Sequence, residues 1–419
     1  MPDFLFISPS VDTNTVILED PRSETSSPPS LIMVVPARDK HYLFGYPILH
    51  SASPAFQNLI FQSMNTNKTY ECWSTSRITQ EMMSVVRSPD FGGSGVTMPM
   101  KVTIMKYLDE ITPEARAIGA VNTIVPVLDP LTGTMKAVGT NTDYLGVRNS
   151  LLRQLGLQVD RTFSPSDTFV PGQAAALSIG GGGAARSAIH AMHTMGLAPI
   201  YLMNRDQSEI DALFECFPNL PLVHLKNIAQ AEKELAEPGR PPIVAIVGAI
   251  PAYLPVTDAE RGVYNMITHV LTQPYATQPL SDVSSLPLPH QRLFLDMAYR
   301  PRNTPLLQIA AALNWEPIGG IQAMIEQGFA QSRMWQAGDA SVEVACGDRV
   351  GEDVMTKARN FVEEMADVVV AGKEYDRAQD SPDAPLRSPC SAKWSTTLKG
   401  PRPQFTASQS PGGMCQAKP

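Results

Sequence analysis

Short apolar runs alternate with helix-length segments along most of the chain. In the first half, the runs rich in β-branched and aromatic residues are 41–50, 92–100, 120–128 and 135–143. Gly, Pro or Asn bounds each run, as expected for strands. Between them, 53–64 and 101–111 have the pattern of helices. The first half of the sequence therefore predicts an α/β arrangement.

A second block with the same alternation begins near residue 174. Its apolar runs are 174–179, 197–206, 241–252 and 292–299. A helix-length segment separates each run from the next, which is how a parallel sheet with crossover helices is encoded. The fold class that we predict is therefore α/β, with two lobes.

The two ends of the chain differ from this pattern. Residues 1–38 contain the Ser/Pro/charged run PRSETSSPPS, and residues 373–419 have the same character. Such segments bury too little apolar surface to become ordered. We expect a flexible leader and a disordered tail.

The composition narrows the possible partners. With 419 residues, of which 43% are hydrophobic and 18% charged, the chain can form about two or three globular units. The net charge of −8 argues against nucleic-acid binding. Five widely spaced cysteines without a CxxC pair favour reduced thiols and no metal site. With no signal-peptide pattern and no long apolar run, we expect a cytoplasmic protein without membrane association.

A glycine-rich loop follows the first apolar run of the second block. Gly180, Gly182 and Ala185 form a GxGxxA arrangement at the start of a helix pattern. The first glycine permits a tight turn, the second lets backbone amides approach a pyrophosphate, and the small third residue lets helix and strand pack closely. The loop predicts a dinucleotide site, with a purely structural turn as the alternative.

The next strand ends in Asn204, Arg205 and Asp206. A carboxylate at this point accepts hydrogen bonds from the ribose hydroxyls and repels a 2′-phosphate, so Asp206 favours NAD. Arg205 leaves NADP open, because a guanidinium can bind a 2′-phosphate or stack on adenine.

Four segments of the first lobe are polar where a core would be apolar. They are GYPILHSASPAFQN, GGSGVTMPMK, IGAVNTI and GTNTDYLG. A ligand that carries several hydroxyls and a carboxylate needs Ser and Asn for hydrogen bonds and a charged pair at the reacting atom. A small polar molecule is therefore the expected substrate.

These segments, in this order and followed by the glycine loop, resemble the shikimate/quinate dehydrogenase family, in its fungal, free-standing type. The segments 296–307 and 319–328 continue the resemblance, which covers about 41–335. It implies reversible oxidation of a ring hydroxyl of shikimate or quinate with a nicotinamide cofactor. The domains that it implies are a substrate-binding catalytic domain at 39–145, a Rossmann-type dinucleotide-binding domain at 146–314, and helices at 315–372 that return to the catalytic domain.

The resemblance also implies a role for individual residues. Lys101 and Asp143 would be the catalytic pair that handles the proton. The implied substrate-binding residues are Ser51, Ser53, Thr97, Asn122, Tyr299 and Gln327. The implied cofactor-binding residues are Gly180, Gly182, Gly183, Ala184, Ala185, Asn204, Arg205 and Asp206.

Each of these residues also has a structural interpretation. Asp143 could be a helix N-cap, Asn122 a turn former, and the two serines at 51 and 53 a helix start before Pro54. Lys101 could be a lysine whose apolar stem lies along the surface. Tyr299 could be a core aromatic residue and Gln327 a surface helix residue.

Three positions depart from the family pattern. Gly95 stands where the family usually has Asn, Gln57 where it has His, and Gly248 where it has Asn near the nicotinamide. These changes leave open a secondary-metabolism dehydrogenase acting on a related cyclic polyol acid. A non-catalytic dehydrogenase-like regulator is the alternative from another class, and the presence of both Lys101 and Asp143 argues against it. The sequence leaves a monomer and a homodimer equally open.

Overall fold

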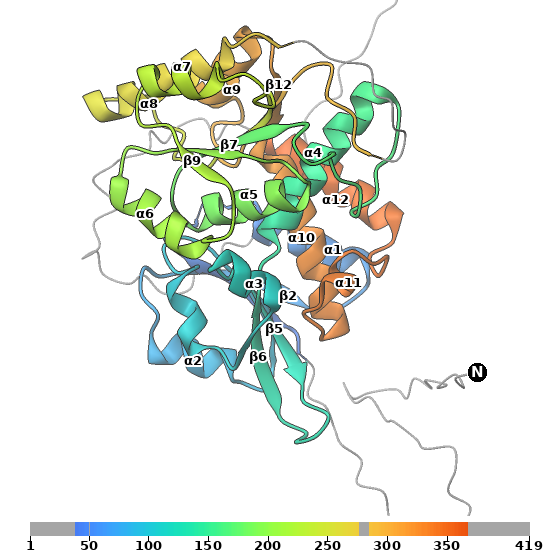
Figure 1. Cartoon of the computed structure of the whole chain (residues 1–419). Coiled ribbons are helices and arrows are strands. Elements are labelled where there is room, and N and C mark those ends of the chain that lie inside the picture. Colours follow the sequence, from blue (N-terminus) through green and yellow to red (C-terminus); the bar gives the residue numbers. More distant parts are fainter. Residues whose placement is uncertain (1–37, 50, 276–284, 368–419) are drawn as a thin grey trace, which may run out of the picture. The chain divides into compact units, whose positions relative to one another are not determined.

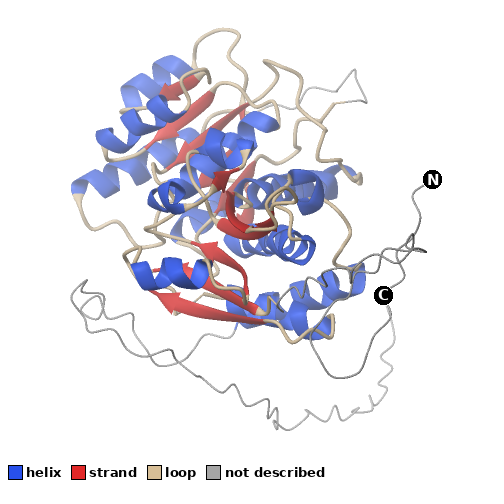
Figure 2. Ribbon diagram, turned by 90° about the horizontal axis from the view of Figure 1, so that it is seen from below, coloured by secondary structure: helices blue, strands red, loops and turns tan. Residues whose placement is uncertain are grey.

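Two β-sheets organise the part of the chain that the structure describes, residues 38–49, 51–275 and 285–367 of a computed structural model. Both sheets belong to one compact unit and are flanked by helices (Figures 1 and 2). The predicted two-lobed α/β fold is confirmed. The expected tail, and the leader apart from Arg38, lie outside the described residues.

The first sheet has the strand order β2-β1-β3-β5-β6-β4. Its strands are β1 (Lys40–Gly45), β2 (Thr69–Ser74), β3 (Phe91–Val96), β4 (Glu110–Ile111), β5 (Thr123–Leu128) and β6 (Met135–Thr140). The pairs β1–β2, β1–β3 and β4–β6 are parallel, whereas β5 is antiparallel to both β3 and β6. The helices of this lobe are α1 (Ser53–Ser63), α2 (Gln80–Val86) and α3 (Pro113–Ile118).

The central strand β3 is fully buried although its sequence, FGGSGV, offers little side-chain bulk. Large aromatic residues fill the space instead. A Cβ atom at Gly93, whose φ is +142°, would lie 2.3 Å from the Trp335 ring, and one at Gly95 would lie 2.5 Å from the Tyr70 hydroxyl. Glycine in β3 thus lets α10, which carries Trp335, pack close to the sheet.

The segment 101–111 differs from the helix that its pattern predicts. It contains a 3₁₀ helix, η1 (Thr103–Tyr107), followed by the short strand β4. The carbonyl of Lys101 accepts a hydrogen bond from the Val121 amide (2.8 Å). This tertiary bond takes the backbone at Lys101 out of a helical pattern, and the β-branched run that follows favours a helix only weakly.

The second sheet is parallel throughout and has the order β12-β11-β10-β7-β8-β9. Its strands are β7 (Ala175–Ile179), β8 (Ile200–Met203), β9 (Leu222–His224), β10 (Ile243–Gly248), β11 (Leu293–Asp296) and β12 (Glu316–Gly319). The connecting helices are α5 (Gly183–Thr194), α6 (Gln207–Cys216), α7 (Ile228–Leu235), α8 (Asp258–Leu271) and α9 (Pro305–Ala312). The order reverses at β7, the place where such sheets bind ligands.

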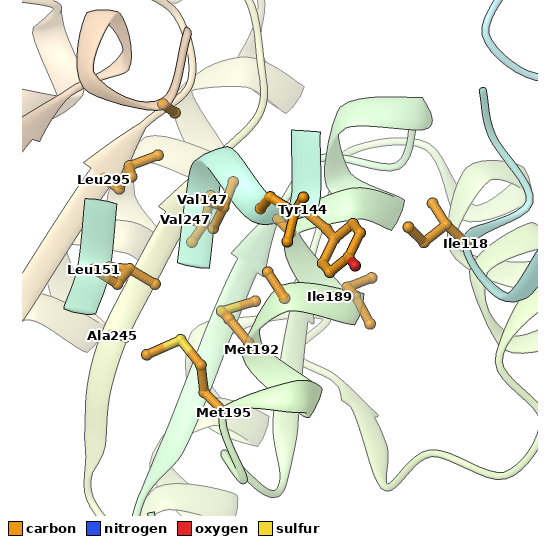
Figure 3. Close-up of a cluster of buried hydrophobic side chains, with 14 of the residues drawn as sticks. Ile118, Tyr144, Val147, Leu151, Ile189, Met192, Met195, Ala245, Val247 and Leu295 are labelled. Atoms are coloured by element: carbon orange, nitrogen blue, oxygen red, sulfur yellow. The ribbon is translucent and has the colours of Figure 1, made fainter. Parts of the chain in front are cut away.

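Two long helices, α4 (Asp143–Val159) and α10 (Gly320–Ala337), pack against each other beside both sheets (Figure 1). Gly146 permits a close crossing, since a Cβ there would lie 2.4 Å from the Ala323 carbonyl oxygen. The apolar face of α4 is buried together with α5, β10 and β11, through residues such as Val147, Ile189 and Leu295 (Figure 3). The chain continues through α11 (Val342–Ala345) and α12 (Glu352–Asp367), which contact α10.

Within the described ranges, every helix is too short or too polar to span a membrane.

Candidate active site

Lys101 and Asp143 form an ion pair at the ends of two secondary-structure elements. Lys101 follows β3 in the turn after Pro99, and Asp143 is the first residue of α4. Lys101 Nζ lies 2.5 Å from Asp143 Oδ2, and the two side chains are only 15% and 11% exposed. The predicted catalytic pair is therefore assembled and largely shielded from solvent.

The carboxylate of Asp143 does not cap its own helix. The N-cap of α4 is Thr142, whose own side chain makes no capping hydrogen bond. Instead, the second oxygen, Oδ1, accepts a hydrogen bond from Asn122 Nδ2 (2.8 Å). Both oxygens thus bind side chains outside the helix, which orients the carboxylate toward Lys101.

Asn122 connects this pair to α10. Its amide Nδ2 also donates to Gln327 Oε1 (3.2 Å), and its Oδ1 accepts from the Thr142 amide (2.7 Å). One helical turn further along α10, Gln331 Nε2 donates to Thr123 Oγ1 (2.9 Å). Asn122 and Gln327 are both buried. Asn122 is therefore not a solvent-exposed turn residue, and Gln327 is not a surface residue of α10.

The first turn of α5 lies directly against Lys101. A Cβ atom at Gly183 would be 3.2 Å from Lys101 Cβ and 3.3 Å from its Cδ. Ser187 Oγ donates to the Gly183 carbonyl (3.1 Å) and accepts from Asn141 Nδ2 (3.0 Å), two residues before Asp143. The glycine loop and the Lys101–Asp143 pair are therefore parts of one site.

The remaining predicted substrate residues lie outside this network. Ser51 Oγ accepts from the Ser53 amide (3.2 Å) at the start of α1, as the structural interpretation expects. Thr97 is half-buried at the end of β3, and half-buried Tyr299 packs against the apolar cluster of α1, α10 and α12. Among the described residues, no hydrogen bond joins any of these four to Lys101 or Asp143.

The glycine loop has the geometry that a dinucleotide requires. Gly180 has a φ of +120°, which favours glycine, and Gly182 is the N-cap of α5. A Cβ at Gly182 would meet nothing within 4 Å. The start of α5 thus presents free space beside its amides, which fits a pyrophosphate, while Ala185 is buried against the sheet. The residues of this loop, Gly180 to Ala185, fit the predicted cofactor.

At the two glycines that replace the asparagines usual in the family, other side chains fill the space. The hydroxyl of Tyr70 occupies the space beside Gly95, and Asp296 Oδ1 would lie 3.1 Å from a Cβ at Gly248. Asp296 is fully buried and accepts a hydrogen bond from Thr304 Oγ1 (2.6 Å), and its burial raises its pKa to about 6. At the third departure, buried Gln57 donates to the Gly328 carbonyl on α10 (3.0 Å).

Sequence reasoning missed several residues of this site: Thr123, Asn141, Thr142, Ser187 and Gln331. Asn141 and Thr142 belong to the quoted segment GTNTDYLG, and Gln331 follows Gln327 by one helical turn. The helical spacing could have identified Gln331. Within the described part of the chain, no group of three His, Cys, Asp or Glu side chains could hold a metal ion.

Comparison with known proteins shows which family this chain resembles. Residues 43–124 match the family model described as the shikimate dehydrogenase substrate binding domain. The dehydroquinate dehydratase and shikimate dehydrogenase from S. pombe is 31% identical, with a TM-score of 0.55 over 76% of this chain. The chain therefore contains a segment similar to the substrate-binding domain of shikimate dehydrogenases, and most of it resembles a solved protein of that kind. It spans 52% of the S. pombe protein, about half its length.

Two further structures share the shikimate dehydrogenase fold at lower identity. The shikimate dehydrogenase of Mycobacterium tuberculosis is 22% identical, with a TM-score of 0.54, and the match covers 77% of this chain and 99% of that one. The shikimate 5-dehydrogenase of Thermus thermophilus, in complex with NADP(H) and shikimate, is 24% identical, with a TM-score of 0.50 and coverages of 76% and 99%. Both matches span about three quarters of this chain.

Proposed function

We propose that this protein reversibly oxidises a ring hydroxyl of shikimate or quinate with a nicotinamide cofactor, giving 3-dehydroshikimate or 3-dehydroquinate. One observation carries the proposal. The Lys101–Asp143 ion pair is shielded from solvent, is fixed by Asn122, and lies against the first turn of the helix that follows the glycine loop. The similarity to shikimate dehydrogenases supports the same reaction.

The residues of the site fit the requirements of alcohol oxidation. The hydroxyl proton must leave to a base when the carbon loses a hydride, and must return in the reverse direction. Lys101, with Asp143 bonded to Nζ, exchanges this proton, while Asn122 fixes the other carboxylate oxygen. The bound nicotinamide would supply the hydride acceptor.

The substrate ring is positioned by the residues that the family resemblance implies. Ser51 and Ser53 hold the carboxylate, and Thr97 and Asn122 bind ring hydroxyls. Tyr299 and Gln327 complete the pocket. In the structure, Gln327 already contacts Asn122, which supports a shared role.

The cofactor that we propose is NAD, held by the loop from Gly180 to Ala185 and by the turn of Asn204, Arg205 and Asp206. The Thermus thermophilus relative contains NADP(H) and shikimate, which supports a nicotinamide dinucleotide and a cyclic polyol acid. NADP is the competing cofactor.

A related cyclic polyol acid is the second candidate substrate. The observation that favours it is in β3, where Gly95 stands in place of the asparagine usual in the family and the Tyr70 hydroxyl fills the space beside it. One changed hydrogen-bonding group is enough to alter the preference between substrates that differ by a hydroxyl.

An assay of the purified protein tests the proposal. Shikimate and quinate are each offered with NAD⁺ and NADP⁺, and formation of the reduced nicotinamide is followed at 340 nm. We expect saturable reduction with at least one pair. If neither substrate supports reduction of either cofactor while dinucleotide binding persists, the non-catalytic regulator replaces the enzyme as the better interpretation.

A further inference from the structure

The turn after β8 is surrounded by carboxylates. In Rossmann-type folds this turn lies beside the adenosine ribose, and an Arg there can receive a 2′-phosphate. Here its side chains already have partners. Asn204 Nδ2 donates to Glu209 Oε2, Arg205 pairs with Glu260, and Asp206 is the N-cap of α6.

Glu260 is held in place on the first turn of α8. Its Oε2 accepts hydrogen bonds from the amides of Val256 (2.9 Å) and Thr257 (3.0 Å), and it forms a capping box with Thr257. Its Oε1 lies 2.5 Å from Arg205 Nη1. The backbone hydrogen bonds lower the pKa of Glu260 to about 2, so the carboxylate is charged at neutral pH. Arg205 therefore points its charge at a fixed anion.

Glu209 lies against the glycine loop itself. A Cβ atom at Gly181 would be 2.4 Å from Glu209 Cβ and 2.6 Å from its Oε2. The same carboxylate binds Asn204, so it lies between the pyrophosphate loop and the ribose turn. A negative charge at this point repels a phosphate group added to the ribose.

Asp206 has a structural partner of its own. Its Oδ1 accepts hydrogen bonds from the Ser208 amide (2.8 Å) and the Ser208 hydroxyl (2.7 Å). Asp206, which the sequence predicts to bind the ribose, thus caps α6. Glu209 binds the Asn204 amide group and Glu260 binds the Arg205 guanidinium, the two groups that a 2′-phosphate would use.

We propose that Glu209 and Glu260 are the residues that select NAD over NADP in this protein. Their carboxylates occupy the side chains of Asn204 and Arg205, which a 2′-phosphate would use, and add negative charge to the turn after β8. The inference rests on the proposed function, because it concerns the preference of the same dinucleotide site.

The experiment compares three variants of the full-length chain, Glu209→Gln, Glu260→Gln and the double variant. Glutamine retains one acceptor oxygen for the capping box. Its amide nitrogen cannot accept a hydrogen bond, so in Glu260→Gln the charge and the bond from Arg205 are both lost. The dissociation constants of NADH and NADPH are measured by the change in nicotinamide fluorescence, without any substrate. The matched control is Glu237→Gln, which breaks a similar exposed pair with Arg240 (2.6 Å) in the connection leading into the amino end of β10.

We expect each single variant to bind NADPH about three- to fivefold more tightly, and the double variant about tenfold, as removal of a competing surface ion pair allows. Binding of NADH should change less than twofold, and the control should bind both as the wild type does. An unchanged ratio of the two constants in the double variant would overturn the inference while leaving the dehydrogenase proposal intact. If the wild type bound neither nucleotide, the proposed function would fail, and this inference with it.

Discussion

At the scale of single residues, Lys101 shows how surroundings assign a role. Its flanking methionines look alike in the sequence, but Met98 is 61% exposed and Met100 is 1% exposed. Only one of them therefore belongs to the core. The lysine stem lies against Gly183, and its ammonium group meets Asp143. The apolar residues before Lys101 thus form a turn that directs the lysine side chain toward Gly183 and Asp143.

Substitution of Lys101 by alanine tests this role. Lys101→Ala removes the group that exchanges the proton, and we expect kcat to fall by about 10²- to 10⁴-fold. Steady-state kinetics with the substrate identified in the assay measure the change. The control is Lys106→Ala, at an exposed lysine five residues further on, which should retain wild-type kcat. An active Lys101→Ala enzyme would remove Lys101 from the mechanism.

At the scale of secondary-structure elements, the site depends on how α4, α5 and α10 meet. Asn141 precedes α4, is 1% exposed, and donates to the Ala120 carbonyl (2.9 Å) and to Ser187 of α5 (3.0 Å). Through Ser187 it is connected to Gly183 at the helix start. This link keeps the glycine loop at a fixed distance from Lys101.

Asn141→Ala should therefore affect both stability and activity. The variant loses every hydrogen bond of the buried side-chain amide, including the one that Oδ1 accepts from the Tyr144 amide (3.3 Å). This loss costs about 1–3 kcal/mol of unfolding free energy, and movement of α5 should raise the KM for the dinucleotide. The matched control is Ser150→Ala on α4, which loses one buried hydrogen bond to the Gly146 carbonyl (2.8 Å). It should lose stability but keep the wild-type KM. Equal KM values in both variants would show that the link does not position the loop.

At the scale of the whole molecule, we expect buried and half-buried titratable groups to shape the response of stability to acid. Burial lowers the pKa of His41 to about 3 and that of His190 to about 4. The His41 ring contacts the rings of Phe61 and Trp335, and the His190 ring packs edge-on against that of Tyr144. Both folded pKa values are below the unfolded value of about 6.5. The two histidines therefore make their full contribution to the free energy of unfolding above pH 6.5 and lose it as the pH falls toward 4 and 3.

Asp296 acts in the opposite direction. Its pKa is about 6 in the folded protein and about 3.8 in the unfolded chain. Its contribution to the free energy of unfolding is therefore complete below pH 3.8 and is lost as the pH rises through 6. Between pH 6 and 4 the two histidines outweigh the one aspartate. We therefore expect the free energy of unfolding to decrease on acidification across this window.

The variant His190→Gln should weaken this acid dependence by about one bound proton. Urea unfolding at several pH values between 7 and 4 measures the slope. His290→Gln, at an exposed histidine, serves as the control and should keep the wild-type slope. An identical slope in His190→Gln would mean that His190 does not contribute through its protonation.

The sequence by itself determined the fold class, most of the strands and the glycine loop, because hydrophobic period and turn residues are local properties. It did not identify β2, β4, β9 or β12. It also identified Lys101, Asp143, Asn122 and Gln327 as site candidates, and the structure joins these four. Their roles in catalysis stay predictions until the kinetics are measured. The helix expected at 101–111 was wrong, because a tertiary hydrogen bond to Lys101 is invisible to local pattern.

Only the tertiary structure decided which partners each ambiguous residue has. Asp143 binds Lys101 and Asn122 and leaves the N-cap position to Thr142. Arg205 meets Glu260 across 55 residues of chain, and Asn122 meets Gln327 across 205. The physical reason is that a polar side chain takes its function from the partner placed beside it, and packing of distant elements, which no local pattern encodes, chooses that partner.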